Sequence, residues 1–456
     1  MKNAALFKSF ARYASLSVLG MLGMSCYILA DTFFVSLGLG KAGLAALNLA
    51  VPVYSIIHGA GLMIGVGGAT KYALLRSGGE ERRANEAFTN ALYLAAALCV
   101  PFILLGALFP GQLASLLGAD AETYEMTRTY LQTLLLFSPA FLCNNVLAAF
   151  VRNDGSPQLA MFSTVSGSLS NILLDWVFIF PCAMGMFGAV FATCLAPVIG
   201  IGVSCLHFLG GKCGFRAVRV PFRAEYVKGC FSLGFSSFVE QLSNAAVMLA
   251  FNAIVYGIAG NTGVAAYGVV ANVALVVISI FTGVAQGTQP LMSRAQGGER
   301  RADVRLLLLY AAAAAVLIAL VVYAVVFFCA SPIAQIFNSE NDPALLSTAA
   351  EGLRLYFIGM PFAGFNVAVC ACFASTDRPL PSQGLSLLRG LVAVIPLAFA
   401  FAALWGAVGL WLAFPAAEAL TAVCGALCLK FYKGKRRGGA DKADGEKGKE
   451  GTEKVA

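Results

Sequence analysis

The sequence predicts an all-α integral membrane protein with twelve transmembrane helices in two six-helix bundles. Hydrophobic residues make up 59% of the 456-residue chain and charged residues only 12%, whereas a soluble domain carries about 25% charged residues. Twelve apolar runs are long enough to cross a bilayer, and the second half of the chain repeats the pattern of the first. This composition excludes a disordered protein, a secreted disulfide scaffold and an ordinary cytosolic enzyme.

Each predicted helix is an apolar run of about 20 residues or more, the length that crosses the hydrocarbon core. In the first half these runs are 14–37, 45–74, 87–109, 126–151, 159–180 and 187–209. In the second half they are 229–257, 264–292, 304–329, 348–373, 382–404 and 407–429. The first run is too long for the apolar part of a cleavable signal peptide.

Lysine and arginine predict the orientation of these helices. With the N-terminus in the cytoplasm, 27 of the 31 basic residues fall in cytoplasmic segments, and Lys41, Arg128 and Arg354 fall outside. This is the positive-inside pattern of a multi-pass protein of the plasma membrane. It explains the net charge of +8 without a nucleic-acid partner. Both termini are therefore expected in the cytoplasm.

An internal repeat with an offset near 220 residues divides the chain into two copies. Four matched pairs illustrate it: Gly40 with Gly260, Arg76 with Arg294, Pro157 with Pro379, and Gly188 with Gly406. Six helices separate the copies, so both share one orientation and are related by an axis along the membrane normal. Two facing bundles of this kind are a transporter architecture, in which a ligand binds between them.

The repeat and the composition predict four parts of the chain. An N-terminal lobe over 1–210 holds six helices, a cytoplasmic linker follows over 211–228, and a C-terminal lobe over 229–432 holds the other six. The tail over 433–456 is rich in Lys, Glu, Asp and Gly, which predicts a disordered cytoplasmic extension.

Four acids lie deep in predicted helices: Asp31, Asp175, Glu240 and Glu418. A charge at the bilayer centre costs about 2.5–3.5 kcal/mol on insertion scales, so these side chains are expected to face the protein interior or water. Glu418 is expected to pair with Arg389, the one basic residue in the middle of a predicted helix.

Asp31 and Asp175 are candidates for binding a coupling ion. Tyr27 precedes Asp31 by one helical turn, Asn171 precedes Asp175 by one turn, and Thr193 lies in the next helix. Their oxygens suit a hard cation such as Na⁺, and two neighbouring carboxylates also suit a shared proton. An interhelical hydrogen-bond network is the alternative. It fits Asn171 and Thr193 taken alone, whereas the acid pair favours a function.

A second polar group is a candidate for binding a substrate. Glu240, Gln241 and Asn244 lie in the seventh predicted helix, and Gln286 and Gln289 of the eighth are expected to line the same cleft. For Glu240 itself, a functional role and structural pairing both remain open.

Other chemistry finds no support in the sequence. The thirteen cysteines lie mostly in apolar runs, where cysteine acts as a small hydrophobe. His58 and His207 stand apart from other candidate residues and are expected to be structural. No phosphate loop, nucleophile triad or zinc motif is present. We therefore expect no enzymatic activity and no cofactor, only a coupling ion.

The chain resembles the multidrug and toxic compound extrusion (MATE) transporters over about 430 residues. The resemblance rests on short runs at 30–35, 171–175, 188–193, 286–290 and 389–396, together with the twelve helices and the repeat. Within that family the chain is most similar to the bacterial MepA-like and DinF-like branches.

The resemblance implies a V-shaped pair of lobes that exports organic, often cationic and lipophilic, compounds in exchange for Na⁺ or H⁺. It implies a cation site at Asp31, Asn171, Asp175 and Thr193, with Tyr27 one turn before the first acid.

Two family features do not transfer directly. Some branches use an acid of the seventh helix, here Glu240, together with an acid of the tenth, which has no counterpart in this sequence. Some members bend the first helix at a proline, whereas the first proline here is Pro52.

Two other functions were weighed. A lipid-linked oligosaccharide flippase of the same superfamily needs several arginines or lysines in its cavity, and only Arg389 lies in the middle of a predicted helix. A membrane-embedded protein that transports nothing has no need of a buried acid pair. The expected partners are small organic molecules and the bilayer, and the expected state is a monomer. The choice between Na⁺ and H⁺, the substrate and the resting conformation stay open.

Overall fold

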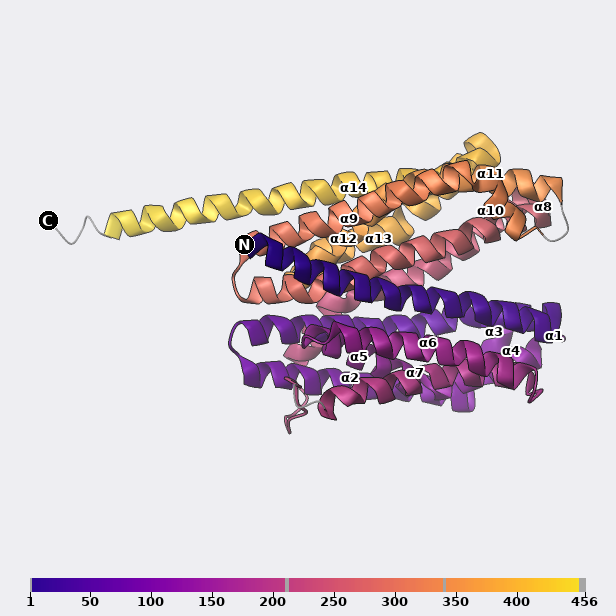
Figure 1. Cartoon of the computed structure of the whole chain (residues 1–456), viewed down its shortest axis with the longest axis horizontal. Helices are drawn as coiled ribbons and strands as arrows, with labels where there is room; N and C mark the ends of the chain where they lie inside the picture. The colour runs from indigo at the N-terminus through magenta and orange to yellow at the C-terminus, as the bar shows by residue number, and fades with distance from the viewer. Residues whose placement is uncertain (1, 210–212, 339–341, 451–456) are drawn as a thin grey trace.

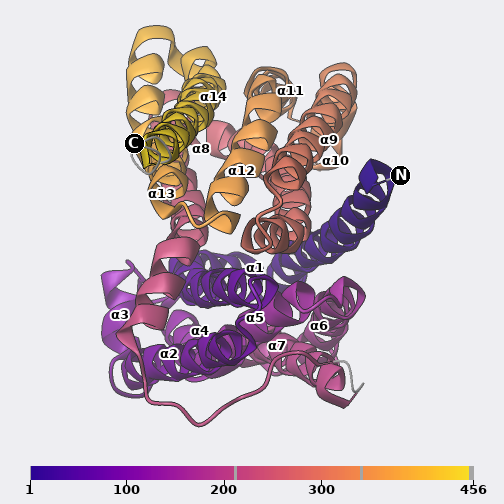
Figure 2. The same cartoon turned by 90° about the vertical axis from the view of Figure 1, so that its left-hand side faces the viewer.

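The computed structural model describes residues 2–209, 213–338 and 342–450, and every regular element in that part of the chain is a helix. The helices form two groups, α1–α7 and α8–α14, which we call the N-bundle and the C-bundle (Figures 1 and 2). The all-α fold class predicted from the sequence is confirmed.

The helices of the N-bundle are α1 Lys2–Ser77, α2 Glu81–Leu108, α3 Pro110–Leu116, α4 Tyr124–Leu136, α5 Ser138–Asn153, α6 Pro157–Ile179 and α7 Gly185–Leu209. Those of the C-bundle are α8 Ala224–Gly297, α9 Arg301–Phe328, α10 Ala330–Ile336, α11 Pro343–Tyr356, α12 Met360–Ser375, α13 Pro379–Leu387 and α14 Val394–Glu450. A 3₁₀ turn, Phe357–Gly359, joins α11 to α12, and a π-helical turn, Leu388–Val392, joins α13 to α14.

Three glycines divide the longest helices. Gly40 in α1, Gly260 in α8 and Gly406 in α14 have φ angles of 66°, 58° and 62°, a conformation that favours a residue without Cβ. Eight helices, or nine if the bent pair α4 and α5 counts as one, are long and apolar enough to cross a membrane. Dividing the three long ones at their glycines gives twelve crossing segments in the described residues, as the sequence predicts.

The turns that follow equivalent helices have the same left-handed backbone conformation in both copies of the repeat. Gly79 after α1 and Glu299 after α8 have φ angles of 87° and 56°. Gly155 after α5 and Asp377 after α12 have φ angles of 101° and 58°. Each second-copy turn therefore holds a side chain in a left-handed conformation that glycine occupies in the first copy.

The apolar core follows the two bundles. One cluster of buried side chains lies almost wholly in the N-bundle, and a separate one surrounds Phe251 and Trp411 in the C-bundle. The first cluster also includes Phe215 and Tyr226, which lie just before and at the start of α8. The first turns of α8 therefore pack on the N-bundle.

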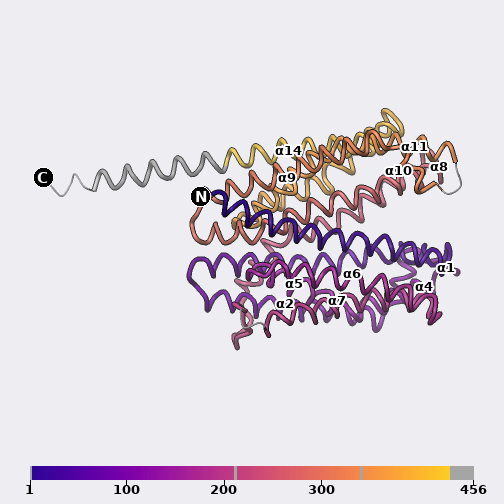
Figure 3. Tube along the Cα trace, in the orientation of Figure 1, coloured from indigo at the N-terminus to yellow at the C-terminus, as the bar shows by residue number. Residues whose placement is uncertain are grey.

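The bundles contact each other mainly along α1 and α8, where glycine removes the side chain at close approaches. A Cβ on Gly67 would collide with the carbonyl of Cys230, and one on Gly234 would collide with the carbonyl of Met63. The ribbons of the two bundles meet near the end that carries the N-terminus and spread apart toward the other end (Figure 1). The turns after α1 and α8 lie at the same end as the N-terminus (Figure 3).

The end of the chain differs from the prediction. The sequence predicts a disordered tail over 433–456, whereas α14 runs on to Glu450. A helix that already exists extends without a new nucleus, which is the costly step of helix formation. Residues 451–456 lie outside the described residues.

Candidate functional site

Asp31 of α1 and Asp175 of α6 come together inside the N-bundle. Asp31 is 7% exposed and Asp175 is completely buried, and the two carboxylates are close enough to interact electrostatically. The Oδ1 atom of each has no hydrogen-bond partner among the described residues. A buried charge without a partner is costly. The pair is therefore suited to receive a cation or a proton.

Asn171, one helical turn before Asp175, lies beside it, and Thr193 of α7 contacts Asn171. Asn171 Nδ2 lies 3.4 Å from Thr193 Oγ1. Turning the Asn171 amide over places its nitrogen 3.1 Å from Asp175 Oδ2 and its oxygen 3.2 Å from the Thr193 main-chain nitrogen. The turned orientation satisfies both groups of the amide and holds one oxygen of Asp175, which leaves the other free.

Three tyrosines complete this polar region. The hydroxyl groups of Tyr27 and Tyr54 lie 2.7 Å apart, and both Tyr27 and Tyr130 interact electrostatically with Asp31. Tyr27 was predicted to belong to the site, whereas Tyr54 and Tyr130 were not. Their signal in the sequence was a phenol within a run of otherwise apolar side chains, which is also the signal of an ordinary core tyrosine.

His58 is connected to this region through Tyr54. The two rings are stacked with centroids 5.6 Å apart, and Asn145 Nδ2 lies 3.3 Å from His58 Nδ1. The expectation that His58 is isolated was therefore wrong, because helical neighbours across α1 and α5 approach it in the fold.

A second polar group lines a small cavity between the bundles, with space of about 70 Å³ for water. Four predicted residues lie on its wall: Glu240, Gln241, Gln286 and Gln289. Asn244 is exposed and is not part of the described wall. It lies one turn farther along α8, beyond the closest contact of the bundles.

An ion pair closes one side of this cavity. Arg389 donates from Nε and from Nη2 to Glu418 Oε1, at 3.1 and 2.9 Å. The predicted pairing of these two residues is confirmed. Asn366 Nδ2 donates to the other oxygen of Glu418 at 2.6 Å, and Glu240 Oε1 lies 3.9 Å from Arg389 Nη1. Two carboxylates thus share one guanidinium, and Glu240 is the more exposed of the two.

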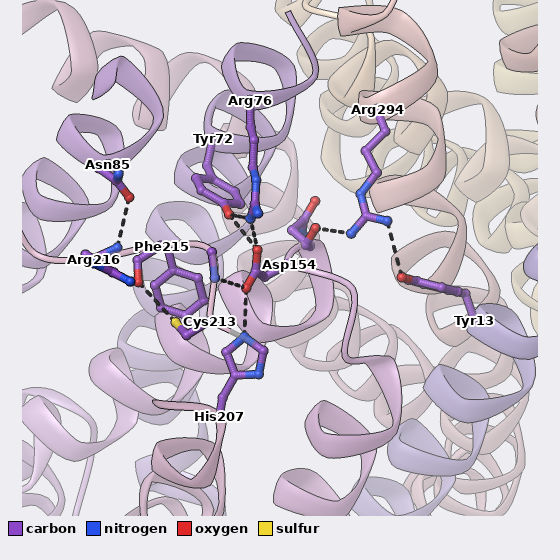
Figure 4. A network of polar contacts seen from close by, with 12 residues as sticks. Tyr13, Tyr72, Arg76, Asn85, Asp154, His207, Cys213, Phe215, Arg216 and Arg294 are labelled. Carbon is purple, nitrogen blue, oxygen red and sulfur yellow. Dashed lines mark hydrogen bonds and ion pairs between the residues drawn. The ribbon is translucent and has the colours of Figure 1, made fainter. Parts of the chain in front are cut away.

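A third network lies at the end where the bundles meet (Figure 4). The carboxylate of Asp154, in the turn between α5 and α6, accepts hydrogen bonds from the Tyr72 hydroxyl, from Arg76, from His207 Nε2 at 2.8 Å and from the Gly214 main-chain nitrogen at 2.7 Å. His207 is therefore not isolated, although nothing in the sequence indicated Asp154 as its partner.

Asp154, His207 and Cys213 also have the chemistry of a metal site, since their ligand atoms lie within 4.8 Å of one another. The surroundings do not favour a metal. Both oxygens of Asp154 already accept hydrogen bonds, one of them from the Arg76 guanidinium. Burial raises the pKa of the Cys213 thiol, whereas a metal binds the thiolate. The network is a structural junction.

Comparison with known proteins identifies the family. The MatE family model matches this sequence twice, over residues 17–177 and 235–400. The chain belongs to the MatE family. Each match covers one copy of the repeat. The first contains the acid pair, and the second contains Glu240 and Arg389.

Related MatE proteins match nearly the whole chain. The multidrug export protein MepA of Staphylococcus saprophyticus is 23% identical over 435 residues, which is 95% of each chain. A crystal structure of MATE in complex with MaL6 is 26% identical with a TM-score of 0.88, covering 93% of this chain and 96% of that one. An outward-facing multidrug resistance MATE family transporter is 26% identical with a TM-score of 0.86, covering 93% and 95%.

Proposed function

We propose that this chain is a secondary active multidrug exporter that moves organic, often cationic compounds out of the cell in exchange for Na⁺ or H⁺. One observation carries the proposal. Asp31 and Asp175 lie together in the N-bundle, and each has a carboxylate oxygen that no other described residue contacts through a hydrogen bond. Membership of the MatE family and similarity to proteins named as multidrug exporters support it.

The acid pair supplies the coupling step. An entering Na⁺ or H⁺ relieves the repulsion between Asp31 and Asp175 and occupies their free oxygens, with Asn171, Thr193 and Tyr27 beside them. Ion and substrate each favour a different arrangement of the two bundles, so binding of one weakens binding of the other. The proposal requires no cofactor, only the coupling ion and the substrate.

The substrate binds between the bundles, at the cavity that Glu240, Gln241, Gln286 and Gln289 line. Glu240 offers a carboxylate to a cationic substrate, and the glutamines offer amide groups. A cavity of about 70 Å³ is smaller than the roughly 300 Å³ at which ligand pockets begin. The bundles must therefore move before an organic molecule can occupy it.

The basic residues place the closed end of the molecule in the cytoplasm, together with both termini. Because the bundles meet at that end and spread toward the other, this structure corresponds to an outward-facing state. We assign the protein to the plasma membrane of a bacterial cell, as a monomer without enzymatic activity or a nucleic-acid partner. The lobes are 1–210 and 229–432, joined by a linker over 211–228.

The flippase alternative is not favoured by the site. A pyrophosphate-bearing cargo needs uncompensated cations, and Arg389 beside the cavity is already held by Glu418.

Ethidium efflux from reconstituted vesicles tests the proposal. A sodium gradient and a pH gradient are imposed separately, with Asp31→Asn beside the unmodified protein. Transport driven by one gradient and lost in folded Asp31→Asn is the expected result and names the ion. Efflux from Asp31→Asn at the normal rate would overturn the role of the acid pair.

A further inference from the structure

The segment between the bundles is bound along its length to the N-bundle. Residues 213–223, which we call the strap, have no regular secondary structure. Four main-chain N–H groups of the strap, at Gly214, Arg216, Val218 and Arg223, donate to N-bundle side chains at 2.7–2.9 Å. The acceptors are, in order, Asp154, Asn85, Thr89 and Asn90. The strap therefore moves with the N-bundle.

The start of α8 is fixed to α2 immediately after the strap. Glu86 of α2 is 3% exposed and accepts from Arg223 Nη1 at 3.2 Å and from the Tyr226 hydroxyl at 3.0 Å. Arg83 and Glu225 form an ion pair at 3.3 Å beside it. Separating α8 from α2 here would leave the buried Glu86 carboxylate without these partners, a costly change.

Among the described residues, the opposite edge of the same interface has no buried acid network between the bundles and is held by Arg294 together with apolar packing of the start of α1 on the C-bundle. Arg294, near the end of α8, donates to the main-chain carbonyl of Asn153 and to the Tyr13 hydroxyl at 3.4 Å (Figure 4). Arg294 is partly exposed and lines a cavity of about 300 Å³. Water in this cavity can solvate the guanidinium when both contacts break, so the bundles can separate here without leaving a buried charge unpaired.

The repeat shows why Arg294 belongs to the moving side. Its counterpart in the first copy is Arg76, which binds Asp154 within its own bundle. Both arginines thus reach the same turn, Arg76 from the N-bundle and Arg294 across from the C-bundle. Only the second contact joins the two bundles. In Figure 2 the start of α8 lies on the left and the N-terminus of α1 on the right.

We propose that the strap edge is the hinge of the transport cycle and that Arg294 is the gate contact that breaks when this end opens. The proposal rests on alternating access as described under the proposed function. It adds that the two edges of the cytoplasmic interface behave differently: the edge at Arg294 separates, and the strap edge stays in contact. Arg294 acts as a positioning residue that favours the closed end and does not contact the substrate.

Two spin-label distances test the proposal in the full-length protein. Genetically encoded nitroxide labels leave the thirteen native cysteines in place. One pair, at exposed Glu81 and Lys228, spans the hinge, and the other, at exposed Gln158 and Arg301, spans the gate. Each pair is measured in the unmodified background, in Arg294→Ala, in Arg294→Lys, and in Arg305→Ala, which changes an exposed arginine on the neighbouring helix.

In Arg294→Ala we expect a second, longer distance in the gate pair and an unchanged distance in the hinge pair. Arg294→Lys should show less of the longer distance, and Arg305→Ala should match the unmodified protein. A gate distance unchanged in Arg294→Ala, or a hinge distance that lengthens with it, would overturn the proposal. These distances do not depend on any cargo. A protein that shifts its gate as expected but exports nothing would contradict the proposed function and leave the hinge assignment intact.

Discussion

Gly67 of α1 lies directly against the main-chain carbonyl of Cys230 in α8, with no room for a side chain between them. Gly234 lies in the same way against the carbonyl of Met63. The closed end of the molecule is thus a contact of backbone with backbone. Small residues at helix interfaces in membranes permit this close approach.

Gly67→Ala is therefore expected to favour the open form of this end. Forcing an extra methyl into a packed interface costs about 1–3 kcal/mol, which is about 5- to 150-fold in the equilibrium between closed and open forms. The gate-pair distance reports the shift, and ethidium efflux should fall. Gly268→Ala is the control, since a Cβ there meets nothing within 4 Å. Equal behaviour of the two variants would contradict this prediction.

Asp175→Asn should stabilise the fold while it abolishes coupled export. Asp175 is buried beside Asp31 and has an oxygen without a partner, so neutralising it removes a repulsion. Thermal unfolding in detergent should show a higher midpoint, and ethidium efflux driven by either gradient should be lost. Asp120→Asn, in the turn before α4, controls for a change of charge elsewhere. A lower midpoint together with normal efflux would show that Asp175 is a structural residue.

Glu418→Gln should strongly destabilise the C-bundle. It would leave Arg389, 12% exposed, without its closest carboxylate, and breaking a buried ion pair from one side costs about 3–5 kcal/mol. Replacing both members, as in Glu418→Met with Arg389→Met, should recover most of that loss. Unfolding of the single and double variants measures the difference. A double variant no more stable than Glu418→Gln would rule out this explanation.

Glu299→Gly should raise the free energy of unfolding by about 1 kcal/mol. The residue has a φ angle of 56°, which strains an L side chain by roughly 1–3 kcal/mol, and the same place in the turn after α1 is occupied by a glycine, Gly79. Gly155→Ala is the reverse change at a φ angle of 101° and should destabilise. Opposite shifts of the unfolding midpoint are expected, and shifts of the same sign would argue against backbone strain.

The architecture was readable from the sequence because the bilayer restricts what can cross it. Apolar length and basic residues predicted the twelve helices, and the repeat paired Gly40 with Gly260, the two positions at which α1 and α8 break. Asp31 and Asp175 stood out since a buried acid is expensive in a membrane. The pairing of Arg389 with Glu418 followed from the same cost.

Other parts of the site carried no such signal. In the sequence Tyr54 and Tyr130 look like ordinary core aromatic residues, and only the structure shows that they lie beside the acid pair. Asn244 lies one helical turn after Glu240 but is exposed and outside the described cavity wall, which periodicity along one helix does not reveal. The attachment of the strap was not visible in the sequence because the strap contributes main-chain N–H groups, which nearly every residue type provides.

Because the strap is attached through main-chain N–H groups, its sequence can vary during evolution. The N-bundle binds four main-chain N–H groups of the strap, so Arg216 and Val218 can be exchanged for most residues other than proline without loss of the attachment. Arg223 is more restricted, because its side chain also donates to Glu86. Gly214 is restricted too, because a Cβ there would collide with Arg76. Among relatives we expect this segment to keep its length while its composition drifts, and an inserted residue to be more harmful than any single substitution.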